Sequence, residues 1–171
     1  MTQDEFTRNM GTGVFWITRC IAQGAYPNPE KTAVLKAGGI THIFNVGTMA
    51  SAPHAKESGM QVIDLPVVDL QRLPDEYVLN FLDQFHACLS TSETKAYIHC
   101  IAGQNRSPTL LWLYLIACGV TEAEARHLVE ERTLDAVAGH AKLIDDKLVL
   151  LAQTHGKSFL PLIREDILIP A

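Results

Sequence analysis

The sequence has few cysteines, and they lie too far apart to form a site together. Its 171 residues include Cys20, Cys88, Cys100 and Cys118 but no Cys-x-x-Cys pair, so neither a zinc site nor a disulfide framework is indicated. The seven histidines likewise lack the spacing of metal ligands. We therefore expect no metal and no cofactor, and a reducing compartment in which a free thiol can work.

Positive charge is also scarce and is not concentrated. The net charge is -5 and no run of lysine and arginine creates a local basic field, so we expect no stable nucleic-acid partner and no membrane partner. Asp4 and Glu5 precede any apolar run, unlike in a signal peptide, and the stretch Leu110–Val120 is too short to span a bilayer. A cytoplasmic location is the resulting expectation.

The chain contains no internal repeat or low-complexity segment. Its hydrophobic fraction of 47% suits one compact α/β domain over residues 1–171, with a core of about 14–155 and a C-terminal tail of 156–171 that packs back on it. Strands are expected at Val14–Ala22, His42–Val46, Gln61–Leu65 and Lys95–Ile98. Helices are expected at Glu30–Ala37, at Ser107–Ala117 with Pro108 in the first turn, from the capping box Thr121–Glu124 to Thr133, and at Ala138–Thr154. A further helix begins at Glu76 with Asp75 as its cap, because apolar residues follow at helical spacing: Val78, Phe81, Leu82, Phe85 and Leu89.

The most informative segment is His99–Ser107, which follows an apolar strand and leads into an apolar helix. Backbone N–H groups of such a loop, and of the helix N-terminus after it, point at an anion held in the turn. The helix dipole, these amides and the Arg106 guanidinium would favour the thiolate of Cys100. The segment therefore predicts an oxyanion cradle with a nucleophile at its floor.

Neighbouring residues suit the same chemistry. Arg106 offers a planar fork that binds two oxygens of a phosphate at once, which lysine cannot do. Gly103 allows a positive φ and a close approach of the backbone to a ligand. Ser107 places a hydroxyl where it can hydrogen-bond the Cys100 sulfur and stabilise it as a leaving group. The predicted phosphate-binding residues are Ile101, Ala102, Gly103, Gln104, Asn105 and Arg106.

At these positions the chain resembles the cysteine-dependent protein tyrosine phosphatases, whose signature is His-Cys, five residues, Arg, then Ser or Thr. Cys20–Pro27 and Gly39–Val46 also resemble the amino-terminal half of dual-specificity phosphatases, and the resemblance covers roughly residues 16 to 135. It implies a single domain with a central, mostly parallel twisted sheet flanked by helices. It also implies a phosphorylated protein substrate carrying phosphotyrosine, and phosphoserine or phosphothreonine as further possibilities.

The family also carries an aspartate as general acid on a loop before the cysteine. Asp69 matches that position, because it follows the strand Gln61–Leu65 and precedes the next helix. Asp64 lies inside the strand and Asp75 at the helix start, so both match less well. His99 precedes the nucleophile on a strand and so points to the opposite face, which suits orienting the loop rather than acting as a base.

The mechanism that the resemblance implies is covalent and needs no metal. The Cys100 thiolate attacks phosphorus while Asp69 protonates the departing oxygen, and water then hydrolyses the cysteinyl-phosphate with Asp69 as base. The loop amides and Arg106 supply the positive field.

Other readings of the motif remain open. Asn105 before the arginine resembles the cysteine-dependent RNA 5′-triphosphatases, although these usually carry a second histidine where this chain has Ala102. Phosphoinositide phosphatases of the superfamily tend to have basic residues in the loop, whereas Ile101, Ala102 and Gln104 are neutral. A phosphoprotein-binding module without turnover is the non-enzymatic alternative.

Three further classes of cysteine enzyme fit the chain less well. A rhodanese-type sulfurtransferase normally closes its loop on arginine one residue earlier. A low-molecular-weight phosphatase or an arsenate reductase would carry the cysteine close to the amino terminus, and Cys100 is far from it. A papain-like hydrolase would need a histidine beside Cys100, and His99 cannot turn onto it from a strand.

Overall fold

The computed structural model describes residues 13–161 and 164–171. One sheet runs through the centre, with its strands in the order β1-β2-β5-β3-β4. The strands are β1 (Val14–Trp16), β2 (Ile21–Gly24), β3 (His42–Asn45), β4 (Gln61–Asp64) and β5 (Ala96–His99). Only β1 runs antiparallel to its neighbour, and the other strand pairs are parallel. This architecture confirms the expected α/β fold with a mostly parallel sheet.

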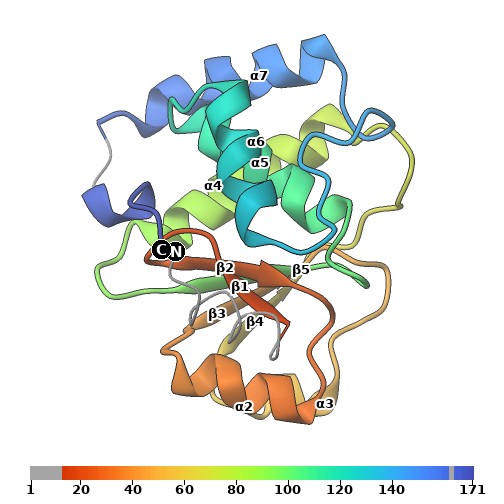
Figure 1. Ribbon diagram of the computed structural model, residues 1–171, viewed down its shortest axis with the longest axis vertical. Coiled ribbons are helices and arrows are strands. Elements are labelled where there is room, and N and C mark those ends of the chain that lie inside the picture. The colour runs from red at the N-terminus through yellow and green to blue at the C-terminus, as the bar shows by residue number, and fades with distance from the viewer. Residues whose placement is uncertain (1–12, 162–163) are drawn as a thin grey trace.

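Helices cover both faces of the sheet (Figure 1). One face carries α2 (Pro29–Ala37) and α3 (Pro53–Lys56), and the other side holds α4 (Asp75–Leu89), α5 (Arg106–Ala117), α6 (Glu122–Arg132) and α7 (Asp146–Gly156). Two 3-10 turns, η1 (Lys157–Phe159) and η2 (Glu165–Ile167), follow. The larger apolar core lies on the side of α4 to α7, and a smaller cluster around Leu35 and Ile43 lies on the other.

The helix α5 is the centre of the larger core. Every residue of this helix is buried, because α4, α6 and α7 and the sheet surround it. Apart from Arg106 the helix carries no charged residue, so burying it completely costs little free energy of desolvation. Its first residue follows the carboxyl end of β5 after a short loop. Because β2, β3, β4 and β5 run in the same direction, this loop lies at the edge of the sheet where α/β proteins bind ligands.

Two expected elements are wrong in extent. The single strand expected at Val14–Ala22 is a pair of antiparallel strands, because the chain turns at Thr18, where the N–H groups of Ile17 and Thr18 both bond to the Ile21 carbonyl. The helix expected at Ala138–Thr154 begins only at Asp146, since Gly139 adopts a φ of +67° and the Asp145 side chain caps the N–H of Leu148.

The expected cap of α4 is also wrong. The helix starts at Asp75 itself, with Pro74 as the N-cap residue, and no side chain in the described part of the chain caps it. The Asp75 carboxylate instead accepts a hydrogen bond from Arg72 Nη1 at 2.8 Å. Proline fits this place because its fixed φ suits the start of a helix.

The C-terminal tail packs back on the domain where the structure describes it. Phe159 is buried and its ring stacks on His86 at 4.0 Å between centroids, and Ile167 is fully buried. Pro170 forms a bridge with Thr18. Leu162 and Ile163 lie outside the described residues.

No helix within 13–161 and 164–171 has the length and apolar character needed to cross a membrane.

Candidate active site

The loop between β5 and α5 is held in place through its carbonyl oxygens. His99 Nδ1 donates to the Cys100 carbonyl at 2.8 Å, and the N–H of Tyr26 donates to the Ile101 carbonyl at 2.9 Å. The Gly103 carbonyl accepts from the Gln23 side chain at 3.1 Å, and the Gln104 carbonyl accepts from the N–H of Val137 at 2.8 Å. These donors come from β5, the loop after β2, β2 itself and the segment after α6, so the loop is fixed from several sides.

Because a trans peptide places its C=O and N–H on opposite sides, each outward carbonyl turns the following N–H inward. The inward groups are the N–H of Ile101, Ala102, Gln104 and Asn105. Gly103 has a φ of +73°, which only glycine adopts without strain, and its N–H bonds to the Cys100 sulfur. The segment predicted to bind phosphate therefore forms one concave set of donors, which favours an anion.

Cys100 lies at the floor of this set and is 2% exposed. Its Sγ is 3.4 Å from Ser107 Oγ. Burial by itself raises the pKa of the Cys100 thiol, but hydrogen bonds from Ser107 and Gly103 and the charge of Arg106 together lower it below its ordinary value. The other cysteines differ, because burial raises the pKa of Cys88 to about 12 and that of Cys118 to about 11.

Arg106 is buried beside the loop, and its guanidinium is held at one end. Nη1 donates to the Val67 carbonyl at 3.0 Å. Nε is buried and has no hydrogen-bond partner among residues 13–161 and 164–171, and it lies 3.9 Å from Asp69 Oδ1. A buried donor without a partner is rare in folded proteins, so this edge of the fork is available to an anion.

Asp69 lies next to the loop. One carboxylate oxygen accepts from Asn105 Nδ2 at 3.3 Å, and the other accepts from the N–H of Leu70 at 2.9 Å. The carboxylate of Asp64 accepts instead from Ser51 at 2.6 Å and from Asn45 at 2.9 Å. Asp75 pairs with Arg72, as described above. Of these three aspartates, Asp69 is the one in contact with the loop and with Arg106.

His99 is 1% exposed, and burial lowers its pKa to about 4. The ring is therefore neutral near pH 7. Since a carbonyl oxygen can only accept, Nδ1 carries the proton that bonds to Cys100 O. The ring packs edge-to-face on Tyr26 at 5.4 Å and stacks on Tyr97 at 5.7 Å between centroids. These contacts fit the expected orienting role.

Sequence reasoning missed several residues that support the loop. Gln23 is fully buried in β2 and bonds to both Gly103 and Ser107. Tyr26 and Val137 hold the loop through their backbone N–H groups, which leave no signal in a sequence. Gln23 did leave one, because a glutamine stands inside the otherwise small and apolar run Ile21–Gly24.

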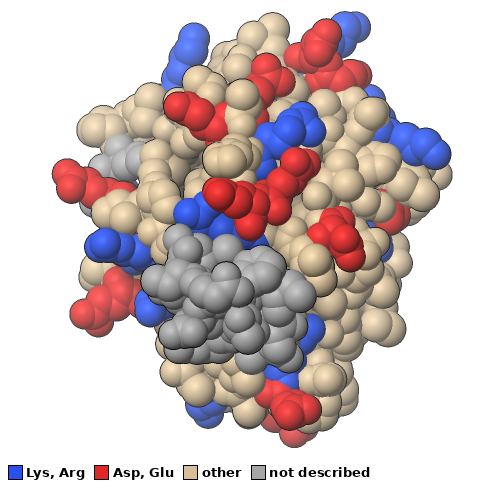
Figure 2. Space-filling view, in the orientation of Figure 1, with Lys and Arg blue, Asp and Glu red and all other residues tan. Residues whose placement is uncertain are grey.

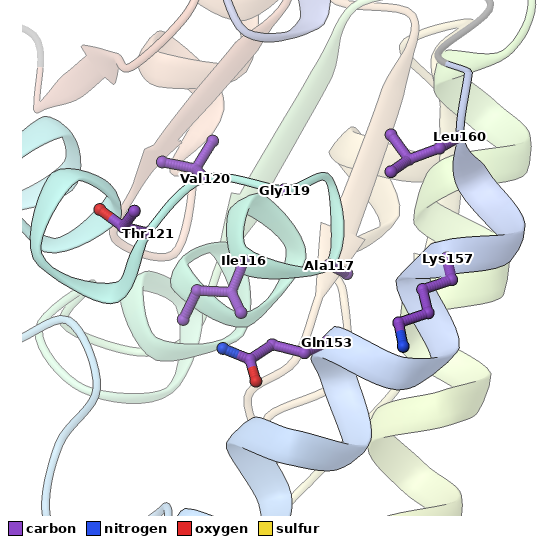
Figure 3. Close-up of a pocket in the computed structure, with 8 residues that line it drawn as sticks. All are labelled: Ile116, Ala117, Gly119, Val120, Thr121, Gln153, Lys157 and Leu160. Carbon is purple, nitrogen blue, oxygen red and sulfur yellow. The ribbon is translucent and has the colours of Figure 1, made fainter.

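A cavity of about 280 Å³ lies elsewhere, at the C-terminal end of α5 (Figure 3). It is lined by Ile116, Ala117, Gly119, Val120, Thr121, Gln153, Lys157 and Leu160. The Cys100 loop lies at the other end of this helix, roughly 18 Å away for its length at 1.5 Å per residue. Cys118 also lies at the far end, too distant to form a disulfide with Cys100 without rearrangement.

Charges of both signs are interspersed over the face that Figure 2 shows. In the part of the chain that the structure describes, no three His, Cys, Asp or Glu side chains are grouped so as to hold a metal ion. The expectations about cofactors, nucleic acid and membranes stay predictions.

Cys100 at the floor of inward N–H groups, with the Arg106 guanidinium beside it, is the arrangement that the resemblance to the cysteine-dependent phosphatases predicts. The family model "Dual specificity phosphatase, catalytic domain" matches residues 21–142, and the chain belongs to this family. The resemblance inferred from the motif is thereby confirmed.

Individual phosphatases are also similar to this chain in sequence or in structure. Protein tyrosine phosphatase type IVA 2 of Mus musculus is 31% identical over 104 residues, which cover 59% of this chain and 62% of that protein. The match thus spans less than two thirds of the length of this curated relative. The crystal structure of Tk-PTP in the active form has a TM-score of 0.64 at 16% identity, covering 85% of this chain and 97% of that chain. PTPMT1 has a TM-score of 0.66 at 17% identity, covering 85% and 94%. At these identities the two structures show a shared fold.

Proposed function

We propose that this chain is a phosphomonoester hydrolase that works through a cysteinyl-phosphate and needs no metal. The observation that carries the proposal is the buried Arg106 Nε, which has no hydrogen-bond partner among the described residues and lies at the rim of a loop whose N–H groups turn inward. A phosphoryl group fits this place, because its oxygens accept from the amides and from the free edge of the fork at once. Cys100 lies below with a lowered pKa, as a nucleophilic thiolate requires.

The reaction has two steps. In the first, the Cys100 sulfur forms a bond to phosphorus, the bond from phosphorus to the substrate oxygen breaks, and the Asp69 carboxyl gives its proton to that oxygen. In the second, water attacks phosphorus and gives a proton to Asp69, the bond from sulfur to phosphorus breaks, and inorganic phosphate leaves. Ser107 stabilises the departing thiolate, and His99 orients the loop without exchanging a proton.

The substrate we propose is a phosphorylated protein, with phosphotyrosine preferred over phosphoserine and phosphothreonine. Exposed apolar side chains adjoin the site: Val68, Leu70, Ile101 and Val137 are 53%, 49%, 39% and 39% exposed. Val68 and Leu70 flank Asp69, Ile101 follows Cys100, and the N–H of Val137 bonds to the loop. Apolar surroundings favour the ring of a phosphotyrosine over a polar chain. The cytoplasmic location expected from composition belongs to the same proposal.

Two other substrates of the superfamily are less well supported. The asparagine that suggested an RNA 5′-triphosphatase donates to Asp69, which gives Asn105 a place in the site that does not depend on a nucleotide. One structural neighbour, PTPMT1, has been solved in complex with PI(5)P. In this chain the loop residues Ile101, Ala102 and Gln104 are neutral, so they offer no charge to additional phosphates.

The test is hydrolysis of p-nitrophenyl phosphate in EDTA between about pH 5 and pH 8. We expect turnover by the wild type and by Cys118→Ser, whose cysteine lies at the far end of α5, and none by Cys100→Ser. Because the thiolate is the reactive form, kcat/KM should rise with pH through the lowered pKa of Cys100. Absence of turnover in a folded wild type, both on this ester and on phosphotyrosine peptides, would favour the binding module. Phosphoserine peptides, 5′-triphosphate RNA and phosphoinositides complete the comparison of kcat/KM.

A further inference from the structure

Gln23 lies under the Cys100 loop and bonds to it twice. Its side chain comes from β2 and is fully buried. Nε2 donates to the Gly103 carbonyl at 3.1 Å, and Oε1 accepts from the Ser107 hydroxyl at 2.8 Å. The side chain thus joins the middle of the loop to the first turn of α5.

The neighbours of Gln23 determine which way its amide faces. A carbonyl oxygen can only accept, so the amide nitrogen faces Gly103 and the amide oxygen faces Ser107. An amide oxygen can also only accept, so Ser107 gives its proton to Gln23. Because the Ser107 hydroxyl has a single proton, the Cys100 sulfur at 3.4 Å has to be the donor in its contact with Ser107 Oγ.

The contact between the Cys100 sulfur and the Ser107 hydroxyl, in this arrangement, fits a neutral thiol and not a thiolate. A thiolate has no proton to donate, so the Ser107 hydroxyl can stabilise it only by turning its proton toward the sulfur, whereas the backbone N–H groups of Ser107 and Gly103 favour the thiolate without any such turn. Gln23 Oε1 then loses its donor while it is buried, which is unfavourable. The Ser107 hydroxyl therefore favours the Cys100 thiolate only by the difference between two hydrogen bonds.

We propose that Gln23 is a positioning residue of the Cys100 site, which holds the loop through Gly103 and competes with the Cys100 sulfur for the proton of Ser107. Its importance for catalysis rests on the proposed phosphatase function, because that function makes Ser107 a partner of the reacting sulfur. The competition itself is a property of the protein without substrate and can be measured there.

The other charged and titratable groups near the sulfur come from three elements. Arg106, from α5, favours the thiolate by its charge. On β5, burial lowers the pKa of His99 to about 4 and raises the pKa of Tyr97, so both rings are neutral near pH 7. Asp69, from the loop after β4, lies 3.9 Å from Arg106. A change at Gln23 leaves all of these groups in the protein, so they act equally in every variant compared.

The experiment measures the rate at which iodoacetamide alkylates Cys100 as a function of pH, by mass spectrometry of the peptide that contains it. The proteins are the wild type, Gln23→Met, Ser107→Ala and the double variant. Methionine is close to glutamine in shape but accepts no strong hydrogen bond. We expect Gln23→Met to lower the midpoint of the thiol by roughly half to one pH unit, and Ser107→Ala to raise it.

The double variant separates competition for the proton from simple loosening of the loop. Without the Ser107 hydroxyl there is nothing to compete for, so Gln23→Met should lower the midpoint in the wild-type background by more than it does in the Ser107→Ala background. The hydrogen bond to Gly103 is lost in both backgrounds, so its effect cancels in the difference between the two shifts. An unchanged or raised midpoint in Gln23→Met, or an equal shift in both backgrounds, overturns the proposal.

A second measurement needs no change at Gln23 and decides the matter if Gln23→Met does not fold. In the wild type, the side-chain amide NMR signals of Gln23 should shift with pH at the alkylation midpoint of Cys100, and in Cys100→Ala they should not. If the chemical shifts of the Gln23 amide do not change at the pH of the Cys100 midpoint, the proposal is overturned. Neither measurement involves a phosphate ester, so failure of the phosphatase proposal and failure of this one give different results.

Discussion

Replacing Gly103 by alanine tests how closely the loop is packed on the sheet. The added Cβ would lie 2.5 Å from the Gly24 carbonyl carbon, 2.6 Å from its oxygen and 2.9 Å from the nitrogen of Ala25. All three atoms belong to the backbone of β2 and of the turn after it, so no side chain can rotate away to make room. The residue also has a φ of +73°, which an L side chain rarely adopts.

The expected loss of stability has two parts. The left-handed conformation costs alanine about 1–2 kcal/mol, and overpacking against a rigid neighbour costs about 1–3 kcal/mol. Gly103→Ala should therefore lower the free energy of unfolding by about 2–5 kcal/mol, or else shift the loop away from β2. Either outcome disturbs the inward N–H groups, so kcat/KM on p-nitrophenyl phosphate should fall.

Gly119→Ala is the matched control. Gly119 also has a positive φ, of +96°, but no atom of the described residues lies within 4 Å of its added Cβ, so only the conformational part applies. Urea unfolding followed by tryptophan fluorescence gives the free energies, since Trp112 is fully buried. If Gly103→Ala were as stable as Gly119→Ala and kept wild-type kcat/KM, the close packing of loop and sheet would be refuted.

Three further predictions concern the site. Asp69→Ala should lower kcat by roughly 10²–10⁴-fold and change the inhibition constant of inorganic phosphate far less; steady-state kinetics with undiminished kcat would move the general acid elsewhere. Arg106→Lys should lower kcat/KM by at least about a hundredfold despite the retained charge, because lysine lacks the fork; activity near that of the wild type would contradict the bidentate role. Burial lowers the pKa of His99 to about 4 in the folded protein, against about 6.5 in the unfolded chain. As the pH falls from about 6.5 to about 4, the unfolded chain therefore binds the proton first, and the free energy of unfolding decreases. Between pH 7 and pH 5 the wild type should lose roughly 2 kcal/mol more than His99→Asn in urea unfolding, and equal losses would show that His99 is not buried in neutral form.

The chain order of the loop explains why so much of the site could be predicted. His99–Ser107 are consecutive, and the strand before them and the helix after them each have a clear pattern, so local sequence determines the cradle. The two elements whose extent was predicted wrongly, the strand at Val14–Ala22 and the helix at Ala138–Thr154, are interrupted by local features that the apolar pattern does not show. The turn at Thr18 is closed by backbone bonds, and the late start of α7 depends on Gly139 and on the Asp145 cap, which compete with an apolar pattern that continues through them.

By itself, the sequence determined the loop that joins Cys100, Gly103 and Arg106, because these residues act on one another across a few peptide bonds. Only the tertiary structure decided which aspartate reaches the loop, what holds Arg106 and what lies beneath Ser107. The bonds that decide these points join residues far apart in the chain: 36 positions for Asp69 and Asn105, 39 for Val67 and Arg106, and 84 for Gln23 and Ser107. Parallel strands bring such residues to one edge of the sheet, and a hydrogen bond formed there depends on the packing of the whole domain and not on any local pattern.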